Sequence, residues 1–160
     1  MDTGPERCPG HNVESVNTEI NAPEELARYR FGYVVRHAEH PVLELTWLQT
    51  SSAMSDEDWM TGLMMLAAEA EATDVTAILI DATSFRHGFE DRESAMSWRD
   101  ARVIPRYNNA GVQKFAFVMP EGYPGPTAES GAAPVFDGPV AQFPTQWFRT
   151  REGAMKWLVG

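Results

Sequence analysis

Two short apolar runs separated by a helical stretch constrain this fold more than any other feature of the chain. Residues 76–80 (TAILI) and 114–118 (KFAFV) are almost entirely apolar and too short to form buried helices. Runs of this kind are typical of strands that are covered on both faces of a sheet. Residues 91–109 between them have helical periodicity, and Pro105 is expected to kink or divide the helix. This order predicts two parallel strands joined by a crossover helix.

A predicted hairpin and a predicted helix precede the first of these runs. Residues 31–35 and 41–48 alternate between apolar and other side chains in the manner of strands, and 36–40 reads as their connection. Ser55 is expected to cap the N-terminus of an amphipathic helix that ends near Thr73.

The end of the chain completes the predicted fold. Residues 142–148 form a last strand, which Pro144 places at an edge of the sheet, and Thr150 caps a short closing helix. The predicted class is α/β, with a mixed sheet of about five strands covered by helices in the order β-β-α-β-α-β-loop-β-α.

Two segments differ in composition from the rest of the chain. Residues 1–28 are predicted to form a flexible acidic tail, since residues 1–25 carry six acidic side chains against Arg7 alone. Residues 29–160 are predicted to form a single domain that contains a long Pro/Gly-rich surface loop at 120–139.

Bulk composition excludes several classes of function. A formal net charge of −10 disfavours nucleic acid as a partner, because such binding depends on neutralising phosphates. No apolar run reaches the roughly 18 residues that a membrane span requires. The single cysteine, Cys8, excludes an internal disulfide framework, and the N-terminus lacks the pattern of a secretory signal. We therefore expect a cytoplasmic protein.

Three segments carry a resemblance to a known family. Residues 78–81 (ILID) are an apolar strand that runs into an acidic residue. Residues 98–120 combine a tryptophan-bearing helix, an Ile-Pro pair and a glycine with the strand KFAFV and a following Met-Pro. Residues 147–158 (WFRTREGAMKWL) are an aromatic strand followed by a helix with an acidic residue, Ala and Trp-Leu. Over residues 30–159 the chain resembles the SpoIIAA-like (STAS/Sec14-like) family of small bacterial proteins.

The resemblance implies a SpoIIAA-like fold and two functions. One is a non-enzymatic regulatory or interaction module that docks to a bacterial protein partner or forms a homodimer. The alternative is a carrier or binder of an apolar small molecule or lipid, in a Sec14-like cavity beneath the Trp98 helix. The chain departs from the family where the 120–139 loop replaces a helix that many relatives carry. Residues 81–84 (DATS) only approximate the phosphorylatable serine motif of STAS antagonists.

The first candidate site follows the strand at 76–80. Ligands of open α/β sheets gather beyond the carboxyl ends of strands. Ser84 is a candidate phosphorylation site there, and Arg86 with His87 could hold an anion. Alternatively, Asp81 and Thr83 only organise the local turn by hydrogen bonds.

The second candidate site is the helical region at 91–109. Arg99, Arg102 and Arg106 lie three and four residues apart, and could bind an acidic partner or a lipid phosphate. Alternatively, they form a solvated face that pairs with nearby acids. A further set of large side chains could line an apolar pocket or simply belong to the core: Trp59, Met60, Met64, Met65 and Trp98.

No recognised catalytic or metal-binding motif occurs in the sequence. There is no nucleophile elbow, P-loop, dinucleotide-binding glycine pattern or cluster with zinc-ligand spacing. His37 and His40 do not have a recognised ligand spacing, and residues 56–58 (DED) suit the start of a helix better than acid–base catalysis. The sequence thus predicts a binding protein without catalytic residues, metal or cofactor, and an enzyme of unknown reaction is the third alternative.

Overall fold

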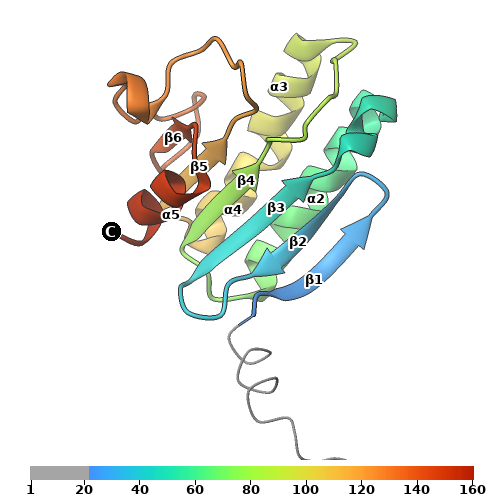
Figure 1. The fold of residues 1–160 in the computed structure, drawn as a ribbon. Coiled ribbons are helices and arrows are strands. Elements are labelled where there is room, and N and C mark those ends of the chain that lie inside the picture. Colours follow the sequence, from blue (N-terminus) through green and yellow to red (C-terminus); the bar gives the residue numbers. More distant parts are fainter. Residues whose placement is uncertain (1–21) are drawn as a thin grey trace, which may run out of the picture.

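The computed structural model describes residues 22–160 and shows a six-stranded mixed sheet (Figure 1). The strands lie side by side in their chain order. The first three are antiparallel, whereas β3 to β6 are mutually parallel. Their bounds are β1 Glu24–Tyr29, β2 Gly32–Arg36, β3 Val42–Trp47, β4 Ala77–Asp81, β5 Lys114–Val118 and β6 Thr145–Phe148.

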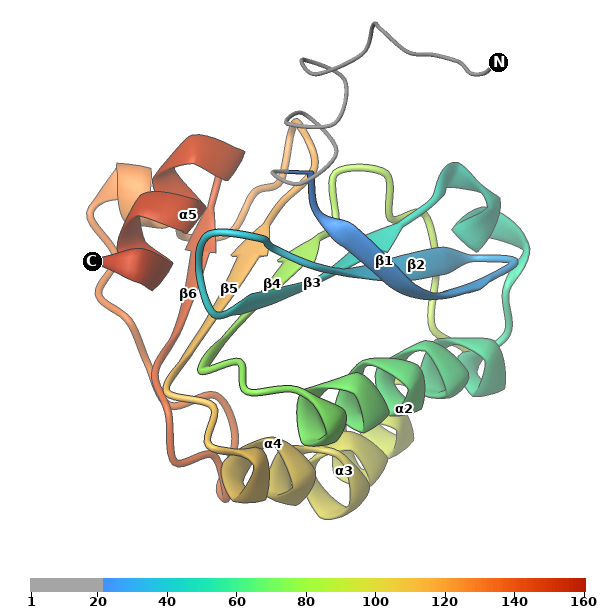
Figure 2. The ribbon, with the colours of Figure 1, turned by 90° about the horizontal axis from the view of Figure 1, so that it is seen from below.

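Helices cover the two faces of the sheet unequally. Figure 2 shows α2 (Asp56–Ala72), α3 (Arg92–Arg102) and α4 (Ile104–Ala110) on one side of the sheet, and α5 (Arg151–Val159) on the other. Because successive strand residues point to opposite faces, the core is divided into two apolar clusters. The larger cluster lies beneath α2, α3 and α4, and the smaller one lies beneath α5.

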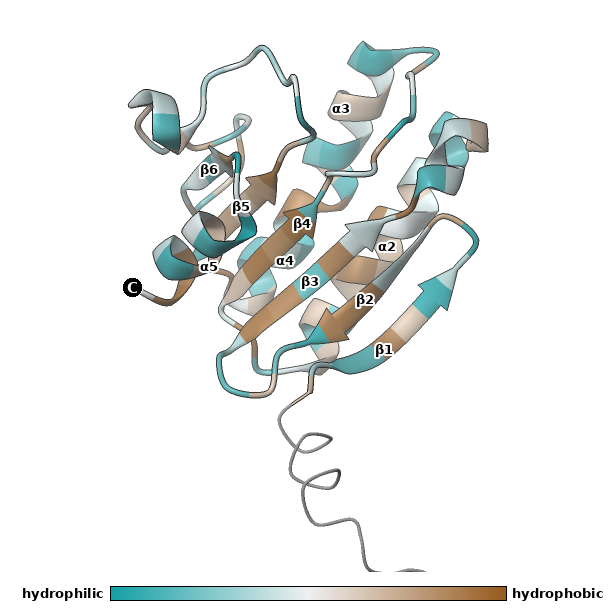
Figure 3. Cartoon of the chain, in the orientation of Figure 1, coloured by the Kyte–Doolittle hydropathy of each residue, from teal (hydrophilic) through white to brown (hydrophobic). Residues whose placement is uncertain are grey.

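The central strands are the most hydrophobic part of the molecule (Figure 3). Both apolar runs of the sequence, in β4 and β5, pair in parallel with their neighbours. Most of their residues are buried, as expected for strands covered on both faces. The general α/β class with a mixed sheet is therefore confirmed.

Local sequence signals set the ends of the helices. The Ser55 side chain accepts a hydrogen bond from the Asp58 amide in a capping box, and α2 ends at the C-cap Thr73. Thr150 caps α5 by accepting from the Gly153 amide. The sequence predicted the Ser55 and Thr150 caps and the end near Thr73, and these predictions are confirmed.

Pro105 divides the second helical region as predicted. The α3 helix stops at Arg102, and α4 begins at Ile104 with the proline in its first turn. A proline has no backbone N–H to bond to the preceding turn, and its ring clashes with that turn, so the helix breaks here instead of continuing. Gly111 ends α4 with a φ of 89°, in the left-handed region that favours glycine.

The start of the domain differs from the prediction. Strand β1 occupies Glu24–Tyr29, so the tail predicted for residues 1–28 is wrong over its last five positions, and the sheet has six strands instead of about five. Leu26, Ala27 and Tyr29 pack against the larger core cluster. Their spacing is irregular because of a register shift between Glu25 and Ala27, which hid the strand pattern. Residues 1–21, including Cys8, lie outside the described residues.

The long connection between β5 and β6 follows the prediction. Residues 119–144 contain a single short helical turn, η2 (Ala128–Ser130). Strand β6 lies at the edge of the sheet, as Pro144 indicated, and Val135 of the loop forms an isolated bridge to Thr145. The remaining helical turn is η1 (Gln49–Ala53), which leads from β3 to α2. No helix in residues 22–160 is long and apolar enough to cross a membrane.

Candidate ligand-binding cavity

A cavity of about 420 Å³ lies between the sheet and the layer formed by α2, α3 and α4. The four parallel strands contribute residues from their carboxyl ends, including Trp47 from β3, Ile80 from β4, Phe117 from β5 and Trp147 from β6. Parallel strands bring these ends to one edge of the sheet, where α/β proteins commonly bind ligands. The parallel register thus gathers side chains that are up to 100 residues apart.

Aromatic side chains dominate the wall of the cavity. Ten of its twenty lining residues are aromatic. The other lining residues are mainly aliphatic or thioether side chains, with few polar groups. The full set is Trp47, Trp59, Leu63, Ile80, Ala82, Phe85, Phe89, Arg92, Met96, Arg99, Ile104, Tyr107, Phe115, Phe117, Met119, Tyr123, Asp137, Phe143, Thr145 and Trp147.

Two stacked aromatic pairs form the wall beside β5 and β6. Phe117 and Trp147 stack with ring centroids 5.8 Å apart and an interplanar angle of 7°. Phe115 and Phe143 also stack, at 5.8 Å and 19°. Phe115 and Phe117 are two residues apart in one strand, so both rings lie on the same face of the sheet. The side of the cavity beside β5 and β6 is therefore formed by aromatic side chains.

The opposite wall comes from the segment between β4 and α3. Phe85 packs edge-on against Trp47 at 5.4 Å, and Phe89 packs edge-on against Trp59 at 5.0 Å. These contacts hold a segment without regular secondary structure against both the sheet and α2. Met96 of α3 completes this wall with a flexible thioether side chain.

Two arginines of α3 line the cavity in different electrostatic states. Arg99 is neutralised, since its guanidinium donates to Asp100 at 3.0 Å and to Asp137 of the long loop at 3.1 Å. Arg92 lies 5.5 Å from the centroid of the Phe89 ring. It makes no ion pair with a carboxylate among residues 22–160.

Tyr107 of α4 brings a polar atom into this apolar surrounding. The residue is 2% exposed and packs against Phe115 at 5.5 Å and Phe143 at 6.4 Å. Its hydroxyl is buried without a hydrogen-bond partner among the described residues. Burial raises the pKa of the Tyr107 phenol, and the Arg99 and Arg106 guanidinium groups oppose that rise. The phenol is therefore a neutral hydroxyl at physiological pH.

The predicted cluster after β4 is divided between a local turn and the protein interior. Asp81 accepts hydrogen bonds from the Thr83 amide at 3.0 Å and from its hydroxyl at 2.6 Å. The Arg86 guanidinium donates to the carbonyls of Thr83 and Phe85. These contacts are the local hydrogen bonds that the sequence left open as the alternative.

His87 lies apart from Arg86. Its ring is 2% exposed, and Nε2 lies 2.9 Å from Asp56 Oδ1 at the start of α2. The same Asp56 carboxylate accepts the amides of Glu90 and Asp91. Ser84 contributes only its carbonyl, which accepts from the Ser51 hydroxyl at 3.4 Å. The structure therefore does not bring Arg86 and His87 together around an anion.

The break at Pro105 separates the arginines of the second candidate site. Arg106 donates to Glu71 of α2 at 2.6 Å, whereas Arg99 turns to the long loop and Arg102 is exposed. They do not converge on one ligand. Trp98 packs against Trp59 at 6.1 Å without lining the cavity. Of the residues that the sequence suggested for an apolar pocket, only Trp59 lines the cavity. The candidates that do not line it are Met60, Met64, Met65 and Trp98.

Sequence reasoning missed most of the lining residues. Phe85 and Phe89 lie on either side of the predicted residues Arg86 and His87, and they face the cavity instead. The sequence feature that could have indicated them is a pair of large apolar residues, four positions apart, in a segment that forms no helix. Phe117 and Trp147 were recognised as strand residues, but the sequence does not show that a cavity lies above them.

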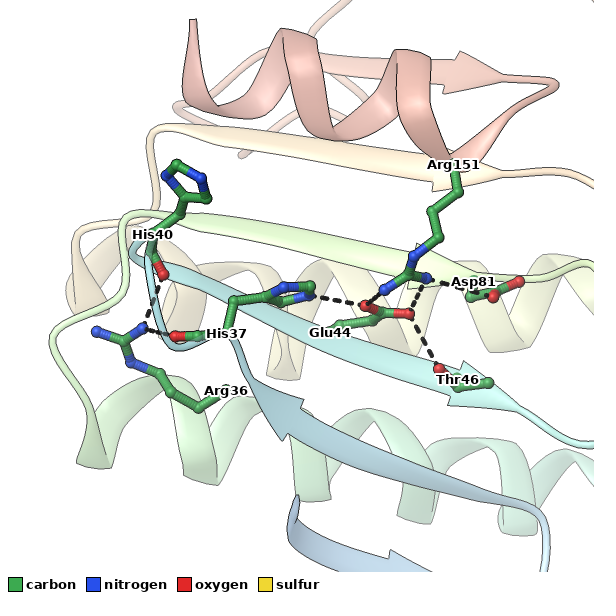
Figure 4. Close-up of polar contacts among 7 residues, drawn as sticks. All are labelled: Arg36, His37, His40, Glu44, Thr46, Asp81 and Arg151. Atoms are coloured by element: carbon green, nitrogen blue, oxygen red, sulfur yellow. Dashed lines mark hydrogen bonds and ion pairs between the residues drawn. The ribbon is translucent and has the colours of Figure 1, made fainter. Parts of the chain in front are cut away.

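A second polar cluster lies on the other face of the sheet (Figure 4). Glu44 of β3 is 2% exposed and forms a bidentate ion pair with Arg151 at the start of α5. His37 Nε2 lies 2.8 Å from the same carboxylate, and the Thr46 hydroxyl donates to it at 3.1 Å. Arg151 also lies 3.6 Å from Asp81.

The Glu44 cluster is suited to stabilising the fold and not to catalysis. Burial alone would raise the pKa of Glu44, but the contacts with His37 and Arg151 outweigh it and lower the pKa to about 2. A carboxylate of such low basicity is a poor general base at neutral pH. Within residues 22–160, no three His, Cys, Asp or Glu side chains are arranged to hold a metal ion. The aromatic cavity is therefore the better candidate site.

Comparison with known proteins found no match to a protein-family model, a curated protein or a solved structure.

Proposed function

We propose that this protein binds an apolar small molecule in the aromatic cavity. The observation that carries the proposal is the cavity itself, about 420 Å³ in volume and lined mostly by aromatic and aliphatic side chains. Small-molecule sites commonly measure about 300–1,000 Å³ and combine an apolar lining with a few polar groups. The four parallel strands also end at this cavity, which supports a ligand site there.

Water is a poor occupant of this space. A buried water needs two to four polar partners, and the lining offers only a few polar side chains. An apolar ligand replaces that unfavourable solvent contact with dispersion contacts to the aromatic rings.

We further propose that the chain belongs to the SpoIIAA-like (STAS/Sec14-like) family. The mixed sheet with crossover helices supports this proposal. The relation to Sec14-like domains led us to expect a cavity beneath the Trp98 helix, and the cavity is lined by Arg92, Met96 and Arg99 of that helix, α3. A lipid or another apolar molecule is thus the ligand that this relation favours.

Replacing Met96 by tryptophan tests the proposed function. The larger side chain is expected to fill part of the cavity and to weaken ligand binding at least tenfold. Binding is measured by the fluorescence increase of N-phenyl-1-naphthylamine, a neutral apolar probe. Native mass spectrometry of the purified protein, before and after organic extraction, identifies a ligand that co-purifies.

Met155→Trp is the matched control. Met155 lies on α5 and packs against the smaller apolar cluster, on the other face of the sheet. The same substitution there should leave probe affinity unchanged. If the wild-type protein does not bind the probe, or if both variants bind it as well as the wild type, the cavity is not a ligand site.

A protein-interaction module is a second proposal, favoured by apolar residues exposed in the 119–144 loop. Phe136 is 62% exposed, and the nearby Val135 and Val140 are also exposed. Exposed apolar groups of this size are typical of contact surfaces.

We expect a homodimer in sedimentation velocity, with the dimer fraction reduced by Phe136→Ser and unchanged by Val159→Ser on α5. A wild-type protein that stays monomeric at 100 μM concentration rejects self-association.

A further inference from the structure

The residues that line the cavity change in exposure and in polarity from one end to the other. Leu63 of α2 and Phe115 at the start of β5 are buried. The charged lining residues, by contrast, are all exposed or partly exposed: Arg92 and Arg99 of α3 and Asp137 of the long loop. The mouth of the cavity therefore lies between α3 and this loop, and its inner end is apolar.

Arg92 is the charged lining residue whose charge is not paired within residues 22–160. Arg99 and Asp137 pair with each other at 3.1 Å. Arg92 forms no ion pair with a described residue. Its guanidinium carbon lies 5.5 Å from the ring centroid of Phe89, which is part of the cavity wall. The mouth thus presents one unpaired positive charge beside an apolar interior.

Carboxylates near Arg92 limit the charge that a ligand can carry. Glu90, Asp91 and Glu93 are its exposed neighbours in the chain, and none of them lines the cavity. Their charges disfavour a dianion beside Arg92. A phosphate monoester carries a charge of about −1.5 to −2 at neutral pH. A carboxylate carries a single charge and matches the fork of a guanidinium with two parallel hydrogen bonds.

Resting on the proposed function, we propose that the cavity binds an amphipathic monocarboxylate whose head pairs with Arg92 at the mouth. The apolar body of the ligand occupies the aromatic interior. This orientation leaves the carboxylate partly hydrated, so that no charge has to be carried into the apolar end of the cavity.

Four compounds with the same decyl tail and different heads test this inference in the full-length protein. Decanoic acid, 1-decanol, decylamine and decyl phosphate each compete with N-phenyl-1-naphthylamine at pH 7, below the concentrations at which they form micelles. Arg92→Gln should weaken decanoate binding about fivefold, because an exposed charge pair is lost. The same variant should leave decanol unchanged and should bind decylamine more tightly than the wild type.

Arg102→Gln is the matched control. Arg102 lies on the same helix, is exposed, and does not line the cavity. Its replacement changes the net charge of the protein by the same amount, and it should leave the affinities for all four compounds unchanged. Thermal unfolding shows that both variants fold.

The outcomes separate this inference from the proposed function. Unchanged decanoate binding in Arg92→Gln, or the same loss in Arg102→Gln, overturns the role of Arg92. An equal loss of decanoate and decanol also overturns it, because Arg92 would then only support the Phe89 wall. A larger loss for decyl phosphate than for decanoate overturns the choice of a carboxylate.

In each of these cases the cavity stays a ligand site as long as Met96→Trp weakens binding of N-phenyl-1-naphthylamine. If the wild type does not bind this probe, or if Met96→Trp has no effect on it, the proposed function itself fails.

Discussion

An Arg151→Ala variant is expected to have an unfolding free energy roughly 3 kcal/mol below that of the wild type at pH 7. Arg151 pairs through both terminal nitrogens with Glu44, which is buried in β3. Removing the arginine leaves a buried carboxylate with only His37 and Thr46 as polar partners. Urea denaturation followed by tryptophan fluorescence measures the change.

Arg149→Ala is the matched control for this variant. Arg149 lies two residues away, is exposed, and has no ion pair among the described residues. Its replacement should change stability by less than about 0.5 kcal/mol. An Arg151→Ala protein as stable as Arg149→Ala would contradict the role of the Glu44 ion pair.

The Glu44 pair should also make the protein sensitive to acid. The pKa of Glu44 is lowered from 4.5 to about 2 in the folded protein. A lowered pKa contributes stability that is fully present above the unfolded value and is lost as pH falls from about 4.5 towards 2. This contribution is on the order of 3 kcal/mol. The stability difference between the wild type and Glu44→Gln should therefore shrink over that pH range.

A Gly62→Ala variant is expected to be destabilised by about 2 kcal/mol, although alanine is the better helix former. A Cβ atom at this position of α2 would lie 2.5 Å from the Trp47 ring and 2.6 Å from the Tyr29 hydroxyl. Both are held in place, because Trp47 is buried in β3 and Tyr29 donates to the Asp58 carbonyl at 2.7 Å. Glycine therefore permits the close approach of α2 to the sheet.

The sign of the effect tests this explanation. Helix propensity alone would make Gly62→Ala more stable by about 1 kcal/mol. The reverse change at the exposed position Ala68 measures the propensity term in the same helix. Thermal and urea denaturation of both variants and the wild type then show whether helix propensity or the clash with Trp47 and Tyr29 dominates at position 62. A stabilised Gly62→Ala would show that Trp47 and Tyr29 can move aside at little cost.

Features that depend on neighbouring residues in the chain were readable from the sequence. Ser55, Thr150, Pro105 and Gly111 set the ends of the helices through hydrogen bonds or backbone geometry within a few residues. The continuous apolar runs of β4 and β5 indicated buried strands. The sequence by itself therefore determined the α/β class, the caps and the division of the second helical region.

Features that depend on distant residues were decided only by the tertiary structure. Strand β1 is stabilised by pairing with β2 and by packing of Leu26 and Tyr29, and its own sequence is acidic and irregular. Glu44 meets Arg151 across 107 positions of sequence. The cavity likewise combines the ends of four strands with α2, α3 and α4.

Local patterns indicate that a side chain such as Phe117 or Trp147 belongs to a strand of the sheet, and both prove to be only partly buried. Whether a cavity remains between that side chain and the helices depends on how closely α2, α3 and α4 approach the sheet. Contacts between residues far apart in the sequence determine that distance.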